Sequence, residues 1–204
     1  LPNFVDDTAC LTLRERALQL AKDNVPSPQE ATIFTADSTA QHAADEYFLT
    51  SGDKIRCFFE KDAFDEHGVL RSEAHLCLNK LGHAMHDLDP VFSAFSRTPQ
   101  MAAVAKQVGL VDPLLLQSMY IFKQPRIGGE VNSHTDHTFL WTEPQSVIGF
   151  WIDIDDATTE NGCMWALPGG HRIPVKARSK LNAARTATIT DVLDQDPYPT
   201  EGLV

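Results

Sequence analysis

The sequence predicts an α+β protein in which N-terminal helices flank a jelly-roll barrel. Apolar residues recur at helical spacing in the first half, whereas short alternating segments separated by turns dominate from Leu114 onward. A run of turn-punctuated short strands is typical of cupin-like barrels, whose interior can enclose a ligand. With 204 residues, of which 43% are hydrophobic and 22% charged, the chain is expected to form one globular domain over residues 1–204.

The first half is expected to contain helices and one strand. Residues 6–8 offer helix-capping side chains, and a helix should follow over about 11–23. Residues 24–50 are rich in Pro, Ser, Thr and Ala, which favours a long loop that either covers a site or is a mobile surface segment. The sequence IRCFF predicts a strand at Ile55–Phe59, and apolar spacing predicts helices at 73–86 and 99–108.

The second half is expected to be built from strands. Alternation predicts them at 114–123, 131–138, 147–154 and 163–167, and residues 201–204 resemble the start of another. In the segment 147–154, Gly149, Trp151 and Asp153 should share one face, so that a large ring lies beside a gap. That face either lines a cavity or uses Trp151 to fill the barrel.

Composition excludes several classes of protein. A formal net charge of -11 argues against a general nucleic-acid binder, which needs clustered Lys and Arg. The four cysteines are scattered without C-x-x-C spacing, so neither a zinc site nor a disulfide scaffold is indicated, and a reducing compartment is the simpler interpretation. No apolar stretch is long enough to span a bilayer and no signal-peptide pattern is present, so a cytoplasmic location without a membrane partner is expected.

The most informative local pattern is His134-Thr135-Asp136, which follows a turn at Gly128 and Gly129. In extended backbone, side chains two residues apart emerge on the same side, so the imidazole and the carboxylate can converge. Such a pair suits non-haem Fe(II), which is commonly held by two histidines and one carboxylate. A hydrogen-bonded or solvated pair is the alternative. His137 should point to the opposite face, and the pattern leaves the third ligand to be found elsewhere.

Five blocks of sequence, taken together, resemble the phytanoyl-CoA dioxygenase family. They occur in order over most of the chain and are residues 47–56 (YFLTSGDKIR), 78–86 (LNKLGHAMH), 117–125 (QSMYIFKQP), 128–136 (GGEVNSHTD) and 160–171 (ENGCMWALPGGH). The resemblance implies a double-stranded β-helix fold and an Fe(II)- and 2-oxoglutarate-dependent oxygenase. Such an enzyme hydroxylates a small-molecule substrate with O2 and releases succinate and CO2.

The resemblance also implies roles for individual residues. His134 and Asp136 look like the first two iron ligands and hence the catalytic pair, and Lys80, Met119 and Trp151 occupy positions that contact 2-oxoglutarate in the family. The ammonium of Lys80 could hold a carboxylate of this cosubstrate, although a surface lysine whose stem packs on apolar residues is the alternative. Met119 could form an adaptable apolar wall or be an ordinary core methionine.

One departure from the family leaves two hypotheses open. In the family, the second histidine ligand and the basic residue for the distal carboxylate of 2-oxoglutarate come from strands after the region corresponding to Val204. We therefore expect a domain truncated at both ends, with C-terminal strands missing. The first hypothesis is an active oxygenase whose remaining ligands lie beyond this chain. The second is a degenerate β-barrel that acts as a binding or structural module. The substrate and the oligomeric state are not readable from the sequence.

Overall fold

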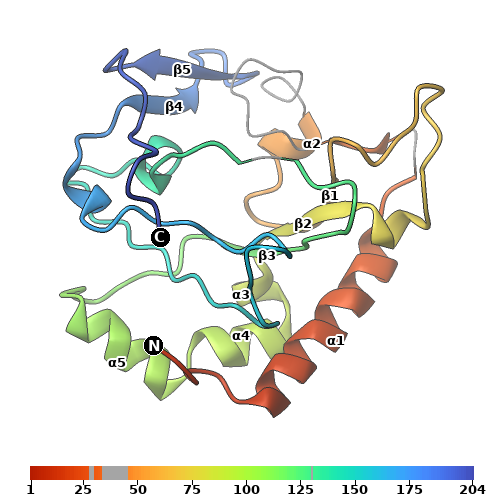
Figure 1. Cartoon of the computed structure of the whole chain (residues 1–204), viewed down its shortest axis with the longest axis horizontal. Coiled ribbons are helices and arrows are strands. Elements are labelled where there is room, and N and C mark those ends of the chain that lie inside the picture. The colour runs from red at the N-terminus through yellow and green to blue at the C-terminus, as the bar shows by residue number, and fades with distance from the viewer. Residues whose placement is uncertain (28–29, 34–45, 130) are drawn as a thin grey trace. The chain divides into compact units, whose positions relative to one another are not determined.

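The computed structural model describes residues 1–27, 30–33, 46–129 and 131–204 and divides into two compact units. Unit 1 comprises Leu1–Thr35 and Thr50–Gly129, and unit 2 comprises Ala36–Leu49 and Glu130–Val204. Unit 1 contains a three-stranded sheet and unit 2 a two-stranded sheet, both antiparallel, and helices accompany each of them (Figure 1). The predicted α+β class is confirmed.

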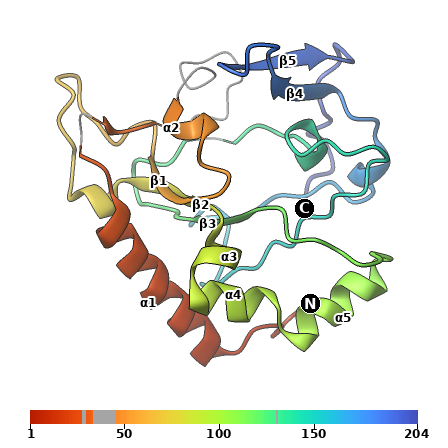
Figure 2. The ribbon, with the colours of Figure 1, turned by 180° about the vertical axis from the view of Figure 1, so that it is seen from behind.

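The first helix of unit 1, α1 (Asp7–Asn24), begins where the capping residues predict. The side chain of Asp6 accepts a hydrogen bond from the backbone N–H of Ala9 at 2.8 Å, which satisfies one of the free donors of the first turn. The helix buries one face, made of Leu13, Ala17, Leu20 and Ala21. It lies alongside α4 and the sheet in both views (Figures 1 and 2). The predicted helix at 11–23 is confirmed, with one more turn at its start.

The sheet of unit 1 has the order β1 (Ile55–Phe59), β2 (Leu78–His83) and β3 (Ser118–Ile121). In register, Phe58 pairs with Lys80 and Lys80 with Ile121, while Gly82 pairs with Met119. Cys57, which pairs with Leu81, lies against α1, since its Sγ is 3.9 Å from the carbonyl oxygen of Ala21. The predicted strand at Ile55–Phe59 is confirmed, and only the central part of the strand predicted at 114–123 forms β3.

The helix predicted at 73–86 is wrong. This segment contains the 3-10 turn η3 (Ala74–Leu76), then the central strand β2, and only then the short helix α3 (Met85–Leu88). The spacing of its apolar residues fits a helix, but β2 is paired on both sides and almost wholly buried, so alternation between a polar and an apolar face is missing from the sequence. Tertiary pairing therefore overrides the local pattern.

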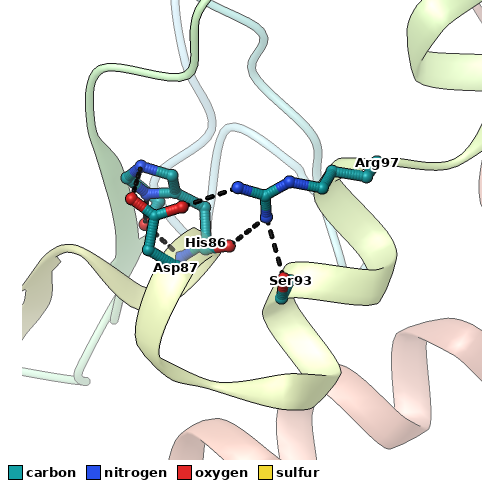
Figure 3. Close-up of polar contacts among 5 residues, drawn as sticks. His86, Asp87, Ser93 and Arg97 are labelled. Atoms are coloured by element: carbon teal, nitrogen blue, oxygen red, sulfur yellow. Dashed lines mark hydrogen bonds and ion pairs between the residues drawn. The ribbon is translucent and has the colours of Figure 1, made fainter.

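Unit 1 also contains α4 (Pro90–Ser96) and α5 (Pro99–Gln107), and polar contacts join α4 to α1 and to α3. Asp89 caps α4 by accepting from the N–H groups of Val91 and Phe92, and it also pairs with Arg16 of α1 at 2.6 Å. Arg97 donates to the carbonyl of His86, to Ser93 and to the carboxylate of Asp87, as Figure 3 shows. The helix predicted at 99–108 is confirmed.

Unit 2 contains fewer regular strands than the sequence predicts. Its elements are α2 (Glu46–Leu49), the 3-10 turns η4 (Asp136–Thr138) and η5 (Gly170–Arg172), and the hairpin of β4 (Ala177–Leu181) and β5 (Thr188–Val192). The strands predicted at 131–138, 147–154 and 163–167 are wrong, because these segments form no regular ladder in the structure. Alternation indicates extended backbone, but a strand also needs a partner, which local sequence does not specify.

Two further predictions concern the ends of segments. Residues 201–204 form no strand, yet the backbone of Val204 exchanges two hydrogen bonds with Ala166 at 2.9 and 3.0 Å, as in an antiparallel pair. Of the loop predicted at 24–50, residues 28–29 and 34–45 lie outside the described residues, and residues 46–49 form α2 instead. Within the described parts of the chain, no helix is long and apolar enough to cross a membrane.

Candidate metal centre

His134 and Asp136 converge in unit 2 as the sequence predicts, although their segment is not a regular strand. Thr135 between them is extended, with φ -117° and ψ 143°, so its neighbours on either side emerge on the same side of the chain. Nε2 of His134 lies 3.6 Å from Oδ1 of Asp136. A cation with ordinary ligand distances of about 2.1 Å can contact both atoms at this separation.

The ring of His134 is held in the orientation that metal binding needs. Its Nδ1 lies 2.7 Å from the carbonyl oxygen of Asn132, and because a carbonyl only accepts, Nδ1 is the nitrogen that carries the proton. This leaves the lone pair of Nε2 directed toward Asp136 in the neutral imidazole. The ring of Phe139 packs edge-on against the imidazole, with centroids 5.7 Å apart, and further restricts its rotation.

The two side chains also perturb each other's titration. The hydrogen bond to Asp136 is the largest cause that raises the pKa of His134, whereas burial opposes it. The same bond is the largest cause that lowers the pKa of Asp136, and the charges of His134 and His137 lower it further. The pair therefore favours a positive charge between its facing atoms, which either a proton or a metal cation can supply.

Gly149 gives the carboxylate of Asp136 the space that it occupies. A Cβ added at Gly149 would lie 3.0 Å from Oδ2 of Asp136, so close that the carboxylate would have to move by a few tenths of an ångström. The segment that carries Gly149 is tied to the same turn, since Nε2 of His137 lies 3.0 Å from the carbonyl of Val147. The gap predicted beside Trp151 thus faces a candidate ligand. His137 contacts a backbone carbonyl rather than this pair, as predicted.

Tyr198 braces the residue between the two candidate ligands. Its hydroxyl lies 3.1 Å from Oγ1 of Thr135 and accepts a hydrogen bond from the backbone N–H of Lys176, also at 3.1 Å. Sequence reasoning missed this residue, because it lies 63 positions from Thr135 and no local pattern marks it. Tyr198 therefore acts on the pair through Thr135 and touches neither ligand.

Trp151 lies in the same segment as Gly149. Its Nε1 donates to Oδ1 of Asp153 at 2.8 Å, so the two side chains share one side, as the alternation predicts. Trp151 is 47% exposed, so the alternative in which its ring fills the interior of a barrel is wrong. Its predicted contact with 2-oxoglutarate stays a prediction.

The other two residues predicted to contact 2-oxoglutarate lie on one face of the sheet of unit 1. Met119 packs over Gly82, where a Cβ would meet its Cγ at 3.6 Å, and Lys80 lies two residues from Gly82 along β2. Met119 is 46% exposed, so it is not an ordinary core methionine. Lys80 is 5% exposed, so the surface-lysine alternative is wrong. Burial lowers the pKa of Lys80 to about 7, and its ammonium lies 5.7 Å from the centroid of the Phe58 ring.

Within the described ranges of the chain, no third candidate ligand joins His134 and Asp136. Among the residues that the structure describes, no group of three His, Cys, Asp or Glu side chains is arranged to hold a metal. His83 and His86 contact Ser51 and Ser118 instead, each through Nδ1 at 2.8 and 2.9 Å, and His171 is exposed in η5. The described residues therefore supply two candidate ligands of the three that the usual Fe(II) site requires.

A buried carboxylate in unit 1 was also missed from the sequence. Glu60 is 3% exposed, accepts from Nδ2 of Asn79 at 3.0 Å, and accepts from the backbone N–H of Gly129 at 3.3 Å. The bond from Gly129 to the Glu60 carboxylate fixes the glycine turn that precedes the His-x-Asp pattern in the sequence. A lone Glu after a strand carries no signal that would reveal this role.

Comparisons with known proteins agree with the resemblance. The family model described as Phytanoyl-CoA dioxygenase (PhyH) matches residues 1–202. "Phytanoyl-CoA dioxygenase domain-containing protein 1" of Bos taurus is 40% identical over 207 residues, covering 100% of this chain and 71% of that protein. The protein of the same name in Danio rerio is 38% identical over 200 residues, covering 96% of this chain and 69% of that protein. "Phytanoyl-CoA dioxygenase" of Arabidopsis thaliana is 42% identical over 159 residues, covering 77% of this chain and 56% of that protein.

Proposed function

The chain belongs to the phytanoyl-CoA dioxygenase family, and on this premise we propose that the protein is an Fe(II)- and 2-oxoglutarate-dependent dioxygenase. It hydroxylates a small organic substrate with O2 and releases succinate and CO2. The double-stranded β-helix expected for the family, formed as a single domain, belongs to the same proposal. The location in the cytoplasm and the absence of a nucleic-acid partner stay predictions from composition.

The observation that carries the proposal is the orientation of His134. Its Nδ1–H is committed to the carbonyl of Asn132, so Nε2 offers its lone pair beside Oδ1 of Asp136, 3.6 Å away. A histidine whose other nitrogen is fixed by a hydrogen bond is the usual arrangement of a metal ligand. When bound, Fe(II) with 2-oxoglutarate and O2 would supply the oxidising chemistry.

In this proposal each residue has one task. His134 and Asp136 hold the metal, and Gly149 keeps the carboxylate of Asp136 free to turn toward it. Lys80 binds a carboxylate of 2-oxoglutarate through its ammonium, and because the side chain is 5% exposed, the attraction between the two charges would be screened little by water. Met119 and Trp151 supply apolar surface to the cosubstrate.

Succinate release from 2-oxoglutarate tests the proposal. His134→Ala and Asp136→Ala should each abolish release and weaken Fe(II) binding under anaerobic conditions, while the circular dichroism spectrum stays native because both side chains are partly exposed. His67→Ala is the matched control, since this histidine is 77% exposed and lies in unit 1. Release at the wild-type rate in either ligand variant would contradict the assignment.

The alternative is a binding or structural module without turnover. The observation in its favour is that two ligands, and no third, come together among the described residues. Fe(II) bound without succinate release, in the presence of 2-oxoglutarate and O2, would favour this alternative over the enzyme.

A further inference from the structure

Three basic side chains follow one another on the same side of β4 and its approach. Lys176, Arg178 and Lys180 alternate along the chain, so they share a face. The outer two have carboxylate partners, because Nζ of Lys176 lies 2.5 Å from Asp194 and Nζ of Lys180 lies 2.5 Å from Asp191. The central side chain, Arg178, differs from them in its partners.

The carboxylate opposite Arg178 pairs with Lys180 instead. Asp191 lies directly opposite Arg178 in the register of β4 and β5, where an ion pair would be expected, yet Asp191 pairs with Lys180. Within the described part of the chain, no carboxylate pairs with Arg178, and its Nε is buried without a hydrogen-bond partner. A partly buried guanidinium without a counter-ion is unfavourable unless something else supplies an acceptor.

An aromatic ring fixes this guanidinium. The central carbon of the Arg178 guanidinium lies 4.6 Å from the centroid of the Trp141 ring, and Trp141 is itself held by a hydrogen bond from Nε1 to Glu143 at 2.7 Å. Cation–π attraction to the ring holds the guanidinium without using any of its N–H donors. A planar, oriented fork of this kind matches carboxylate and phosphate groups.

A second buried polar atom without a partner belongs to the adjacent turn. Strand β4 packs against η4, and both views show the turn beside the strand (Figures 1 and 2). Thr138 of this turn is 7% exposed, and no partner for its Oγ1 exists among the described residues. The same turn begins at Asp136, one of the two candidate metal ligands.

We propose that Arg178 and Thr138, with Arg178 oriented by Trp141, bind a carboxylate or phosphate group of the substrate oxidised at the His134–Asp136 centre. That the bound group belongs to the substrate rests on the proposed function. That Arg178 and Thr138 bind an oxyanion does not. In a chain of net charge -11, an unpaired cation next to the candidate centre selects for an anionic group. The guanidinium edge and the Thr138 hydroxyl are both donors that such a group can satisfy.

The binding of glutarate and of inorganic phosphate to the metal-free protein, measured by isothermal titration, tests the site directly. We expect Arg178→Gln to weaken binding of the preferred anion about tenfold or more, since hydrogen bonds to charged groups are strong. Arg172→Gln is the matched control, because Arg172 is an exposed arginine of the same unit. Tighter binding of glutarate would assign a carboxylate, and tighter binding of phosphate would assign a phosphate.

Three outcomes would overturn the inference. They are the absence of binding to the wild-type protein, equal affinity in Arg178→Gln, and loss of glutarate binding in Lys80→Met rather than in Arg178→Gln. If Arg178→Gln does not fold, the Nε–H resonance of Arg178 in the wild-type protein must shift on titration with the same anions. Succinate release is scored separately, so failure of the oxygenase proposal leaves this result readable.

Discussion

Gly149 lies so close to Asp136 that a single methyl group would disturb a candidate metal ligand. A Cβ at this position would approach Oδ2 of Asp136 to 3.0 Å. We expect Gly149→Ala to displace the carboxylate and weaken Fe(II) binding about tenfold, in the range seen when the support of a ligand is removed. Anaerobic metal titration measures this. Gly52→Ala is the control, because a Cβ there would meet nothing within 4 Å. Equal affinity in the two variants would contradict the prediction.

Lys80→Met should separate cosubstrate binding from metal binding. The substitution keeps the apolar stem of a side chain that is 5% exposed and removes its charge. The affinity for 2-oxoglutarate should fall by about 1.5 to 3 kcal/mol, the range for a hydrogen bond to a charged group. Fe(II) affinity should barely change. An unaltered 2-oxoglutarate titration would leave Lys80 with a structural role only.

The burial of His83 should make the protein less stable in acid. Burial lowers the pKa of His83 to about 4 from an ordinary 6.5, with a smaller contribution from the charge of Lys80. Between these values the unfolded chain binds the proton and the folded chain does not, so the free energy of unfolding falls as the pH drops from 6.5 to 4. The loss is at most about 3 kcal/mol.

Urea unfolding at several pH values checks this prediction. The difference between the wild-type protein and His83→Gln should shrink or reverse as the pH falls, since Gln does not titrate while every other group does so equally in both proteins. A constant difference from pH 7 to pH 4 would mean that His83 protonates as easily in the folded state as in the unfolded chain.

The brace from Tyr198 to Thr135 should be measurable as a coupling energy. Tyr198→Phe removes the hydroxyl that contacts both Oγ1 of Thr135 and the N–H of Lys176, and should destabilise the protein by about 1 kcal/mol. Thr135→Val removes the other end of the first bond. In a double-mutant cycle, the two changes should be non-additive by about 0.5 kcal/mol or more. Strict additivity would show that the contact contributes nothing.

The sequence by itself determined the features that depend on local chemistry. Asp6 begins α1 and Thr98 caps α5, because a capping side chain acts within three residues. The convergence of His134 and Asp136 needs only one extended residue between them, which Thr135 supplies without any sheet. Membership of the family, read from five blocks of residues, is shown by the match over residues 1–202.

Tertiary structure alone decided the features that depend on a distant partner. Residues 78–83 have helical spacing but form a central strand, because β1 and β3 pair with both of its edges. Lys80 resembles a surface lysine in sequence and is buried, because the sheet and its surroundings remove it from water. Among the residues that the structure describes, Arg178 has no carboxylate partner, because Asp191 opposite it pairs with Lys180. Pairing and competition of this kind are set by which segments meet, and the order of residues along one segment does not encode them.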